Sequence, residues 1–178
     1  WHNGLFYKLL RNKISTNFVK LLISMYGKLQ ACVKQNSKLS NTFSVKVGTR
    51  QGCNLSPTLF NVYLNDFPKL LMEMECDPIK LHDQKLSVLM YADDMVLCSK
   101  SEKGLQNALR ALENYCKTWG LKINTEKTKV LVFNKIKKTA LFTLQGKSLE
   151  QVNTYNYLGI TFHRMGTFSL AIKDLTAK

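Results

Sequence analysis

The stretch Val88-Leu89-Met90-Tyr91-Ala92-Asp93-Asp94-Met95-Val96-Leu97 sets two consecutive aspartates between two short apolar runs. Apolar runs of this length around a polar pair predict two strands joined by a tight acidic turn. Neighbouring carboxylates repel each other unless a cation neutralises them. Mg²⁺ suits such a pair, because it takes one or two carboxylates and completes its shell with water and phosphate oxygens. An ordinary Asp-Asp turn is the alternative. The apolar flanks, which we expect to be largely buried, favour a metal site at Asp93 and Asp94.

Helical and β-prone segments alternate on both sides of this hairpin. Ser56 followed by Pro57 is typical of a helix start with Ser56 as the N-cap, and Ser101 and Gly120 are expected to cap the two ends of a later helix. The order predicts an α+β fold in which an antiparallel sheet is covered by helices on one face. The expected helices cover 5–10, a segment that starts after Ser15 or Thr16 and includes Met25, 57–71, 101–120 and a segment from 167. The expected strands cover 31–33, 43–47, 79–81, 86–91, 95–98, 130–133, 141–144, 148–152 and 157–162.

The charge of the 178-residue chain is strongly positive and unevenly distributed. Lys and Arg number 26 against 12 Asp and Glu, a net charge of +14. Residues 1–65 hold nine basic residues and no carboxylate, and the first acidic residue is Asp66. A face built from this segment is positive and favours phosphate as a partner, with a solvated basic face as the alternative. The length fits one domain, and no apolar run approaches the ~20 residues that span a bilayer, so no membrane association is expected.

The cysteines and histidines show no metal-binding pattern. Five cysteines are spread along the chain without a C-x-x-C pair, and the three histidines are isolated. An odd number of dispersed cysteines indicates a reducing compartment, in which they act as small apolar side chains.

Four segments, in order, resemble the motifs of reverse transcriptases, and most closely those of LINE-type (non-LTR) retrotransposons. Tyr91-Ala92-Asp93-Asp94 resembles the catalytic motif, and Gly48-Thr49-Arg50-Gln51-Gly52-Cys53-Asn54-Leu55-Ser56-Pro57 resembles the preceding Q-G-x-x-x-S-P motif. Gly120-Leu121-Lys122-Ile123-Asn124-Thr125-Glu126-Lys127-Thr128 resembles the next motif, and Tyr157-Leu158-Gly159-Ile160 resembles the primer grip. The resemblance implies a polymerase palm of split βαβ type over residues 1–165 and the start of a connection toward the thumb over 166–178.

The same resemblance implies RNA-templated DNA synthesis by a two-metal mechanism that uses Mg²⁺ or Mn²⁺. It makes Asp93 and Asp94 the catalytic metal ligands. It makes Lys127 the residue that approaches the triphosphate and protonates the leaving pyrophosphate; Lys129 competes for that role, and a solvated turn lysine is the alternative.

Further residues are implied to bind the nucleotide, the template and the primer. Gly52 lacks a Cβ and lets a ligand approach the backbone, the Gln51 amide both donates and accepts, and the Arg50 guanidinium matches oxyanions. A solvent-facing loop is the alternative for Arg50. The implied nucleotide- and template-binding set is Arg50, Gln51, Gly52, Ser56, Pro57 and Tyr91, and the implied primer grip is Tyr157, Leu158 and Gly159.

One catalytic element of the family is not found in this sequence. The family's first metal-binding Asp precedes the Q-G-x-x-x-S-P motif, yet residues 1–65 contain no Asp or Glu, and Trp1-His2-Asn3-Gly4-Leu5 resembles the stretch that follows that Asp. We therefore expect a palm that is incomplete at its N-terminus, with the first catalytic strand and the fingers outside the chain. Such a chain is expected to be inactive alone and to expose unpaired strand edges beside the Asp93–Asp94 hairpin.

The expected partners are an RNA template, a DNA primer, dNTPs and the rest of a retroelement polyprotein, namely the fingers, thumb and endonuclease. The expected location is intracellular, in the nucleus or in a cytoplasmic ribonucleoprotein, and not secreted. A non-catalytic nucleic-acid-binding remnant is the main alternative. An RNA-templated RNA polymerase is disfavoured, because that group carries G-D-D where this chain has Y-A-D-D.

Overall fold

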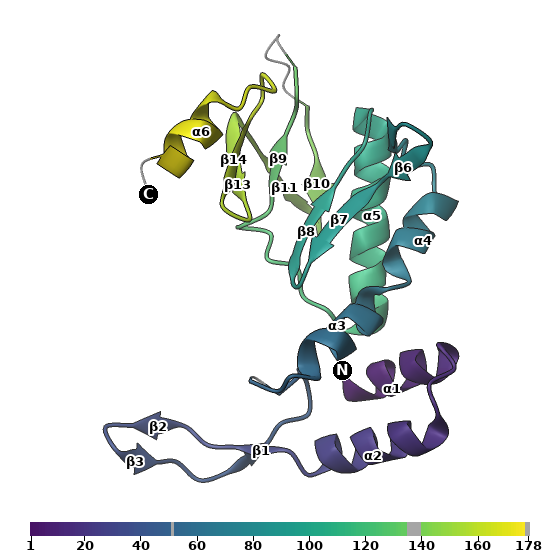
Figure 1. Ribbon diagram of the computed structural model, residues 1–178, viewed down its shortest axis with the longest axis vertical. Coiled ribbons are helices and arrows are strands. Elements are labelled where there is room, and N and C mark those ends of the chain that lie inside the picture. The colour runs from purple at the N-terminus through teal and green to yellow at the C-terminus, as the bar shows by residue number, and fades with distance from the viewer. Residues whose placement is uncertain (51, 135–139, 177–178) are drawn as a thin grey trace.

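The computed structural model describes residues 1–50, 52–134 and 140–176 of the chain (Figure 1). Its helices and strands alternate as an α+β protein. The helices are α1 (His2–Arg11), α2 (Thr16–Gly27), α3 (Ser56–Leu64), α4 (Phe67–Glu73), α5 (Glu102–Trp119) and α6 (Ser169–Thr176). The strands are β1 (Gln30–Ala31), β2 (Lys34–Gln35), β3 (Lys38–Leu39), β4 (Phe43–Ser44), β5 (Ile79–Leu81), β6 (Gln84–Leu86), β7 (Val88–Tyr91), β8 (Asp94–Leu97), β9 (Lys129–Leu131), β10 (Thr143–Leu144), β11 (Lys147–Ser148), β12 (Glu150–Val152), β13 (Thr154–Tyr157) and β14 (Ile160–His163).

Local signals set several helix ends as expected. The Ser15 hydroxyl accepts a hydrogen bond from the Phe18 N–H at 3.3 Å and caps α2. The Ser101 hydroxyl accepts one from the Gly104 N–H at 3.1 Å and caps α5. Gly120 ends α5 in the left-handed region, with φ of 65°, which glycine adopts without steric penalty.

The single long helix expected over 57–71 is wrong. The chain forms α3 up to Leu64 and restarts as α4 at Phe67. Pro68 explains the break, because proline fits the first turn of a helix but in an interior turn removes a backbone donor and clashes with the carbonyl four residues earlier. Ser56 is not the N-cap of α3 either; its hydroxyl donates to the Arg50 carbonyl oxygen at 2.7 Å.

The strands pair two by two rather than in one continuous sheet. Within the described residues each strand has one partner, and the pairs are β1–β4, β2–β3, β5–β6, β7–β8, β10–β11, β13–β14 and β9–β12. The last pair is parallel, with Val130 opposite Gln151, so a wholly antiparallel arrangement is not observed. A parallel pair between residues 21 positions apart depends on the connection between them, which strand propensity does not specify.

The flanks of the central hairpin are less buried than expected. On β7, Leu89 is 45% exposed, Met90 36% and Tyr91 66%. The inner side of the hairpin is covered: Val88 and Met95 pack against α4 and α5, which lie on one face of β7 and β8 (Figure 1). No other described strand is hydrogen-bonded to β7 or β8, so the outer edge of β7 is unpaired. The side chains of Leu89, Met90 and Tyr91 are accordingly exposed to solvent.

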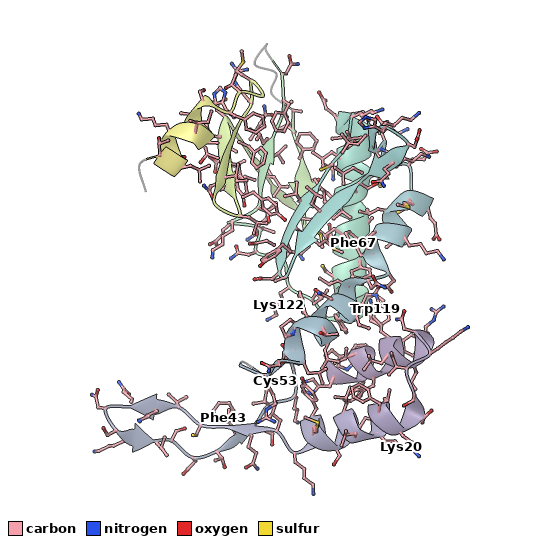
Figure 2. The ribbon with its side chains drawn as sticks, viewed as in Figure 1. Lys20, Phe43, Cys53, Phe67, Trp119 and Lys122 are labelled. Carbon is pink, nitrogen blue, oxygen red and sulfur yellow. The ribbon has the colours of Figure 1, made fainter. Side chains whose placement is uncertain are left out.

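The apolar core consists of three clusters joined by shared helices. A helical cluster is formed by α1, α2 and α3, a central cluster by α4, α5 and the end of α3, and a strand cluster by α5 with β9, β10 and the start of β12. Trp119 packs against both the helical and the central cluster, and Leu97 against both the central and the strand cluster. Figure 2 shows the labelled Phe67 and Trp119 inside the molecule, while Lys20 lies on its surface.

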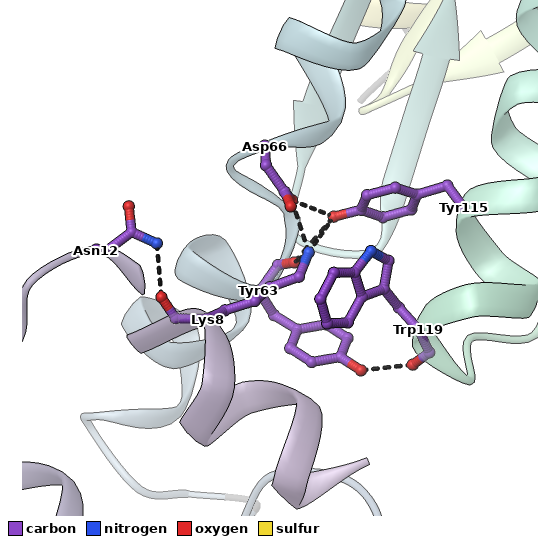
Figure 3. Close-up of polar contacts among 6 residues, drawn as sticks. All are labelled: Lys8, Asn12, Tyr63, Asp66, Tyr115 and Trp119. Atoms are coloured by element: carbon purple, nitrogen blue, oxygen red, sulfur yellow. Dashed lines mark hydrogen bonds and ion pairs between the residues drawn. The ribbon is translucent and has the colours of Figure 1, made fainter. Parts of the chain in front are cut away.

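A buried lysine joins α1 to the rest of the core (Figure 3). The Lys8 side chain is 3% exposed, and its ammonium donates to the Tyr63 carbonyl oxygen and the Asp66 carboxylate at 2.6 Å each and to the Tyr115 hydroxyl at 2.5 Å. The same ammonium lies 3.9 Å from the centre of the Trp119 ring, a cation–π contact. All three donors of the ammonium are used, so its burial is compensated.

Within the described residues, no helix has the length and apolar character needed to cross a membrane.

Candidate active site

The two aspartates lie at the exposed tip of the β7–β8 hairpin. Tyr91 pairs with Asp94 across the hairpin, so Ala92 and Asp93 alone form the turn. Ala92 adopts φ of 51°, in the left-handed region that tight two-residue turns require. Both carboxylates are exposed, and neither forms an ion pair with any described residue. The turn therefore presents two uncompensated negative charges to solvent.

The donor chemistry of this tip fits a hard divalent cation. Carboxylate oxygens are preferred ligands of Mg²⁺ and Mn²⁺, and one or two carboxylates are what Mg²⁺ commonly takes from a protein. The described residues contain no group of three or more His, Cys, Asp and Glu side chains that could hold a metal ion. Asp93 and Asp94 are therefore the two carboxylates of this tip that could bind such a cation.

The β13–β14 hairpin brings Tyr157, the first of the expected primer-grip residues, into the electrostatic neighbourhood of Asp94. Tyr157 is half-buried, and burial raises the pKa of its hydroxyl, with further increases from the negative charge of Asp94 and from the Cys98 thiol. The electrostatic effect of Asp94 places Tyr157 in its neighbourhood, although 63 positions separate them. Tyr157 ends β13 opposite Ile160, so Leu158 and Gly159 form a turn and do not lie in the single strand expected over 157–162.

Leu158 occupies a strained position in this turn. Its φ is 51°, and it is 49% exposed, so its side chain gains little burial for a conformation that leucine disfavours. Replacing Leu158 by Asn creates the Asn-Gly sequence that is typical of such turns. We expect Leu158→Asn to raise the free energy of unfolding by about 1 kcal/mol, measured by chemical denaturation. Leu158→Ala is the control, because it removes the side chain but keeps the Cβ; equal stability of the two variants would contradict the strain.

The loop over residues 48–57 is held by backbone and hydroxyl contacts. Besides the Ser56 hydroxyl bond to Arg50, the Ser56 N–H donates to the Cys53 carbonyl at 3.0 Å, and Pro57 lies in the first turn of α3. Gly52 has φ of 74°, which explains the glycine, and no atom of the described residues beyond its chain neighbours lies within 4 Å of where a Cβ would stand. The Arg50 side chain is exposed. Gln51 lies outside the described residues.

The two lysine candidates differ in their surroundings. Lys129 forms an ion pair with Glu150, its ammonium 2.7 Å from the carboxylate oxygen, and is therefore engaged. Lys127 is exposed, and its backbone N–H donates to the Asn124 side-chain oxygen at 3.1 Å, which fixes the turn. The Lys127 ammonium makes no ion pair with Asp93, Asp94 or another described carboxylate. This contrast favours Lys127 over Lys129 as a lysine available to a ligand.

Comparison with known protein families finds one family that matches most of the chain. The family described as "Reverse transcriptase (RNA-dependent DNA polymerase)" matches residues 1–162. This chain belongs to the reverse transcriptase family. The match spans the acidic hairpin, the 48–57 loop and the β13–β14 turn, and it confirms the expected resemblance of the chain to reverse transcriptases.

Curated relatives of this reverse transcriptase chain come from non-LTR retrotransposons. It is 29% identical to the RNA-directed DNA polymerase from mobile element jockey of Drosophila melanogaster, over 98% of this chain and 19% of that protein. It is 30% identical to the probable RNA-directed DNA polymerase from transposon BS of the same species, over 100% of this chain and 20% of that protein. The Pol polyprotein from retrotransposable element R2 of Popillia japonica is 28% identical over 78% of this chain. The chain spans about a fifth of the length of the jockey and BS proteins.

Two residues of this reverse transcriptase chain make contacts at the 48–57 loop that no signal in the sequence predicts. His2 lies 2.7 Å, through its Nε2, from the Gly48 carbonyl oxygen, and its ring meets that of Tyr26 edge-on at 4.8 Å. This contact holds the start of the 48–57 loop against α1 and α2. Cys53 is the second: hydrogen bonding from the Leu55 backbone outweighs burial and lowers the pKa of its thiol. The partners of His2 and Cys53 are the backbone groups of Gly48 and Leu55. Every residue carries such backbone groups, so the sequence does not indicate which of them a side chain contacts.

Proposed function

We propose that this chain is palm from residue 1 to 165, with 166–178 leading toward the thumb, in a retroelement polymerase that copies an RNA template into DNA. The observation that carries the proposal is the pair of exposed, uncompensated carboxylates at the two-residue turn of β7–β8, with Tyr157 in the neighbourhood of Asp94. Its substrates are an RNA template, a DNA primer and dNTPs, and the fingers, thumb and endonuclease of a retroelement polyprotein are its partners. The five free cysteines support a reducing, intracellular location.

The reaction joins the primer 3′-oxygen to the α-phosphorus of a dNTP and releases pyrophosphate. Asp93 and Asp94 would hold Mg²⁺ or Mn²⁺, which when bound activates the attacking hydroxyl and stabilises the leaving group. Tyr157, Leu158 and Gly159 brace the primer end near these carboxylates. Their positions at the end of β13 and in the following turn support this role.

Residues of two loops bind the charged parts of the substrates. Arg50, with Gln51 and Gly52, contacts the nucleotide or template phosphates, while Ser56 and Pro57 keep this loop at the start of α3. Tyr91, 66% exposed beside the carboxylates, offers its ring to the incoming nucleotide. Lys127 donates a proton to the departing pyrophosphate, a role supported by its exposure and by the ion pair that engages Lys129.

For two-metal catalysis, a carboxylate from a second strand is missing among the described residues. A two-metal centre needs carboxylates from two strands, whereas residues 1–65 contain no Asp or Glu and no third described ligand joins Asp93 and Asp94. We therefore propose that the isolated chain does not extend a primer. The same observation favours a second candidate function, a non-catalytic nucleic-acid-binding remnant.

Primer extension separates these two functions. The 178-residue chain and a longer version, joined at Trp1 to the preceding segment of the jockey polymerase, are each given an RNA template annealed to a DNA primer, dNTPs and Mg²⁺ or Mn²⁺. We expect no extension from the 178-residue chain and template-dependent extension from the longer one. Extension by the shorter chain would show that the second carboxylate comes from within it. No extension by either chain would favour the remnant.

A further inference from the structure

A narrow two-stranded ribbon over residues 28–47, here called the arm, extends away from the helices (Figure 1). Its base is the β1–β4 pair and its tip the β2–β3 pair, closed by a two-residue turn at Asn36 and Ser37 with φ of 45° and 67°. Ser40 ties the two pairs together: its N–H donates to the Val33 carbonyl, and its hydroxyl accepts from the Val33 N–H, both at 2.9 Å. The arm is therefore hydrogen-bonded in two stretches, from Leu29–Val45 to Ala31–Phe43 at its base and from Val33–Ser40 to the turn at its tip.

The arm carries four lysines and lies in a part of the sequence that contains no Asp or Glu. Lys28, Lys34, Lys38 and Lys46 are all exposed, and none forms an ion pair with a described residue. No carboxylate occurs within residues 1–65, so no neighbour in the sequence neutralises these charges. Four lysines on a thin ribbon create a positive potential that attracts a polyanion.

Both faces of the tip carry this charge. Lys34 lies opposite Leu39, and Gln35 lies opposite Lys38, in successive pairs of the ladder. Because side chains of successive pairs point to opposite faces, the tip presents one lysine on each side. Val33 and Leu39 beside them are 58% and 67% exposed. The tip thus combines ammonium groups with apolar surface on an element whose side chains touch little else of the molecule.

The arm is fixed at its base next to the proposed nucleotide loop. Leu29 packs on the helical cluster, and its carbonyl accepts from the Val45 N–H at 2.9 Å. Gly48 lies four residues after the end of β4, and its carbonyl oxygen is 2.7 Å from the His2 Nε2. In Figure 2, Phe43 of the arm and Cys53 of the loop both lie beyond the ends of α1 and α2. The arm directly precedes the 48–57 loop in the sequence. A nucleic-acid duplex that lies against this loop therefore has the arm as a neighbouring basic element.

We propose that the arm binds the phosphate backbone of the primer–template duplex, through Lys34 and Lys38 at its tip. This inference rests on the proposed polymerase function and adds a contact remote from the carboxylate hairpin. The binding is independent of sequence, because lysine contacts phosphate as a point charge and the deep, narrow major groove of an A-like duplex is not read by side chains. The exposed apolar side chains lie against the sugars.

Salt-dependent binding of the 178-residue chain to a fluorescein-labelled RNA–DNA duplex tests the arm. Fluorescence anisotropy gives the affinity between 50 and 200 mM KCl for the unaltered chain and for Lys34→Gln/Lys38→Gln. We expect the double variant to bind about tenfold more weakly at 100 mM and its log–log salt slope to be shallower by about 2, one per lost phosphate contact. Lys34→Arg/Lys38→Arg keeps the charge and is expected to retain the affinity.

The β5–β6 hairpin supplies a matched control, because Lys80 and Lys85 lie opposite each other on another exposed two-stranded element. Lys80→Gln/Lys85→Gln removes the same charge and is expected to leave the affinity within about twofold. An unchanged slope in the arm variant, an equal loss in the control, or no binding by the unaltered chain would overturn the inference. Failure of the polymerase proposal is separate: it shows as no primer extension by the longer chain, whatever the arm does to binding.

Discussion

Asp93→Asn in the longer, jockey-extended chain is expected to lower RNA-templated primer extension by about 10³-fold. The neutral amide keeps the size and the turn but removes the negative charge that holds a divalent cation. Metal ions stabilise charge in such transition states by several kcal/mol, and each 1.36 kcal/mol is about tenfold in rate. Single-turnover extension at saturating dNTP measures the effect directly.

A second acidic hairpin tip controls for charge and folding. Asp83 lies in the turn between β5 and β6, is exposed like Asp93, and lies in no proposed substrate contact. Asp83→Asn is expected to leave the extension rate within about twofold. If Asp93→Asn retains more than a tenth of the rate, or if Asp83→Asn loses as much, the β7–β8 tip is not the metal-binding site.

Lys8→Ala is expected to lower the free energy of unfolding by about 3 kcal/mol. The substitution empties a buried space and leaves the Tyr63 carbonyl without the 2.6 Å contact and Asp66 without its cation. Breaking a buried ion pair from one side costs about 3–5 kcal/mol, and the low end applies because the Asp66 side chain is 52% exposed and water can solvate it. Urea denaturation followed by Trp fluorescence measures the change.

An exposed ion pair provides the control for Lys8. Lys103 and Glu75 are 3.9 Å apart and 82% and 88% exposed, and pairs of this kind contribute little. Lys103→Ala is therefore expected to change stability by less than about 0.5 kcal/mol. A loss in Lys8→Ala no greater than in Lys103→Ala would show that the buried contact does not stabilise the fold.

Acid titration tests the same network from the side of Asp66. Burial raises the pKa of this carboxyl, but hydrogen bonds from Lys8 and Tyr115 outweigh it and hold the pKa below its ordinary value. A depressed carboxyl pKa stabilises the fold above the ordinary pKa, and this contribution is lost as pH falls through the folded-state value. We expect the stability of the wild-type chain to fall more steeply below about pH 4 than that of Asp66→Asn; parallel curves would contradict this.

The sequence predicted those features that short-range chemistry determines. The caps at Ser101 and Gly120 and the acidic turn at Ala92–Asp93 each depend on residues within a few positions, and the structure confirms them. The helix break at Pro68 was readable in the same way, since a proline inside a helical pattern marks a boundary. The apolar spacing on either side of Pro68 instead predicts one uninterrupted helix, because it continues across the proline.

Long-range pairing was not predictable from the sequence. The parallel β9–β12 pair and the exposure of Leu89 depend on which strands lie next to one another. The contact of Lys8 with Asp66 joins residues 58 positions apart. One signal for it existed: Lys8 lies three residues after Leu5 and one before Leu9, on the apolar face of α1, where a charge needs a partner.

The sharing of α5 among the clusters has a consequence for amide hydrogen exchange. Its residues Ala108, Leu109 and Tyr115 belong to the central and strand clusters, and Trp119 at its end reaches the helical cluster. Because α5 packs against all three clusters, its backbone hydrogen bonds can open only when the packing of all of them is lost. The amide hydrogens in the middle of α5 should therefore exchange only through unfolding of the whole molecule. The arm and the two-stranded hairpins, whose outer edges face solvent, should exchange through local fraying. The slowest amides of the chain therefore map the helix that joins the basic N-terminal part to the β7–β8 hairpin.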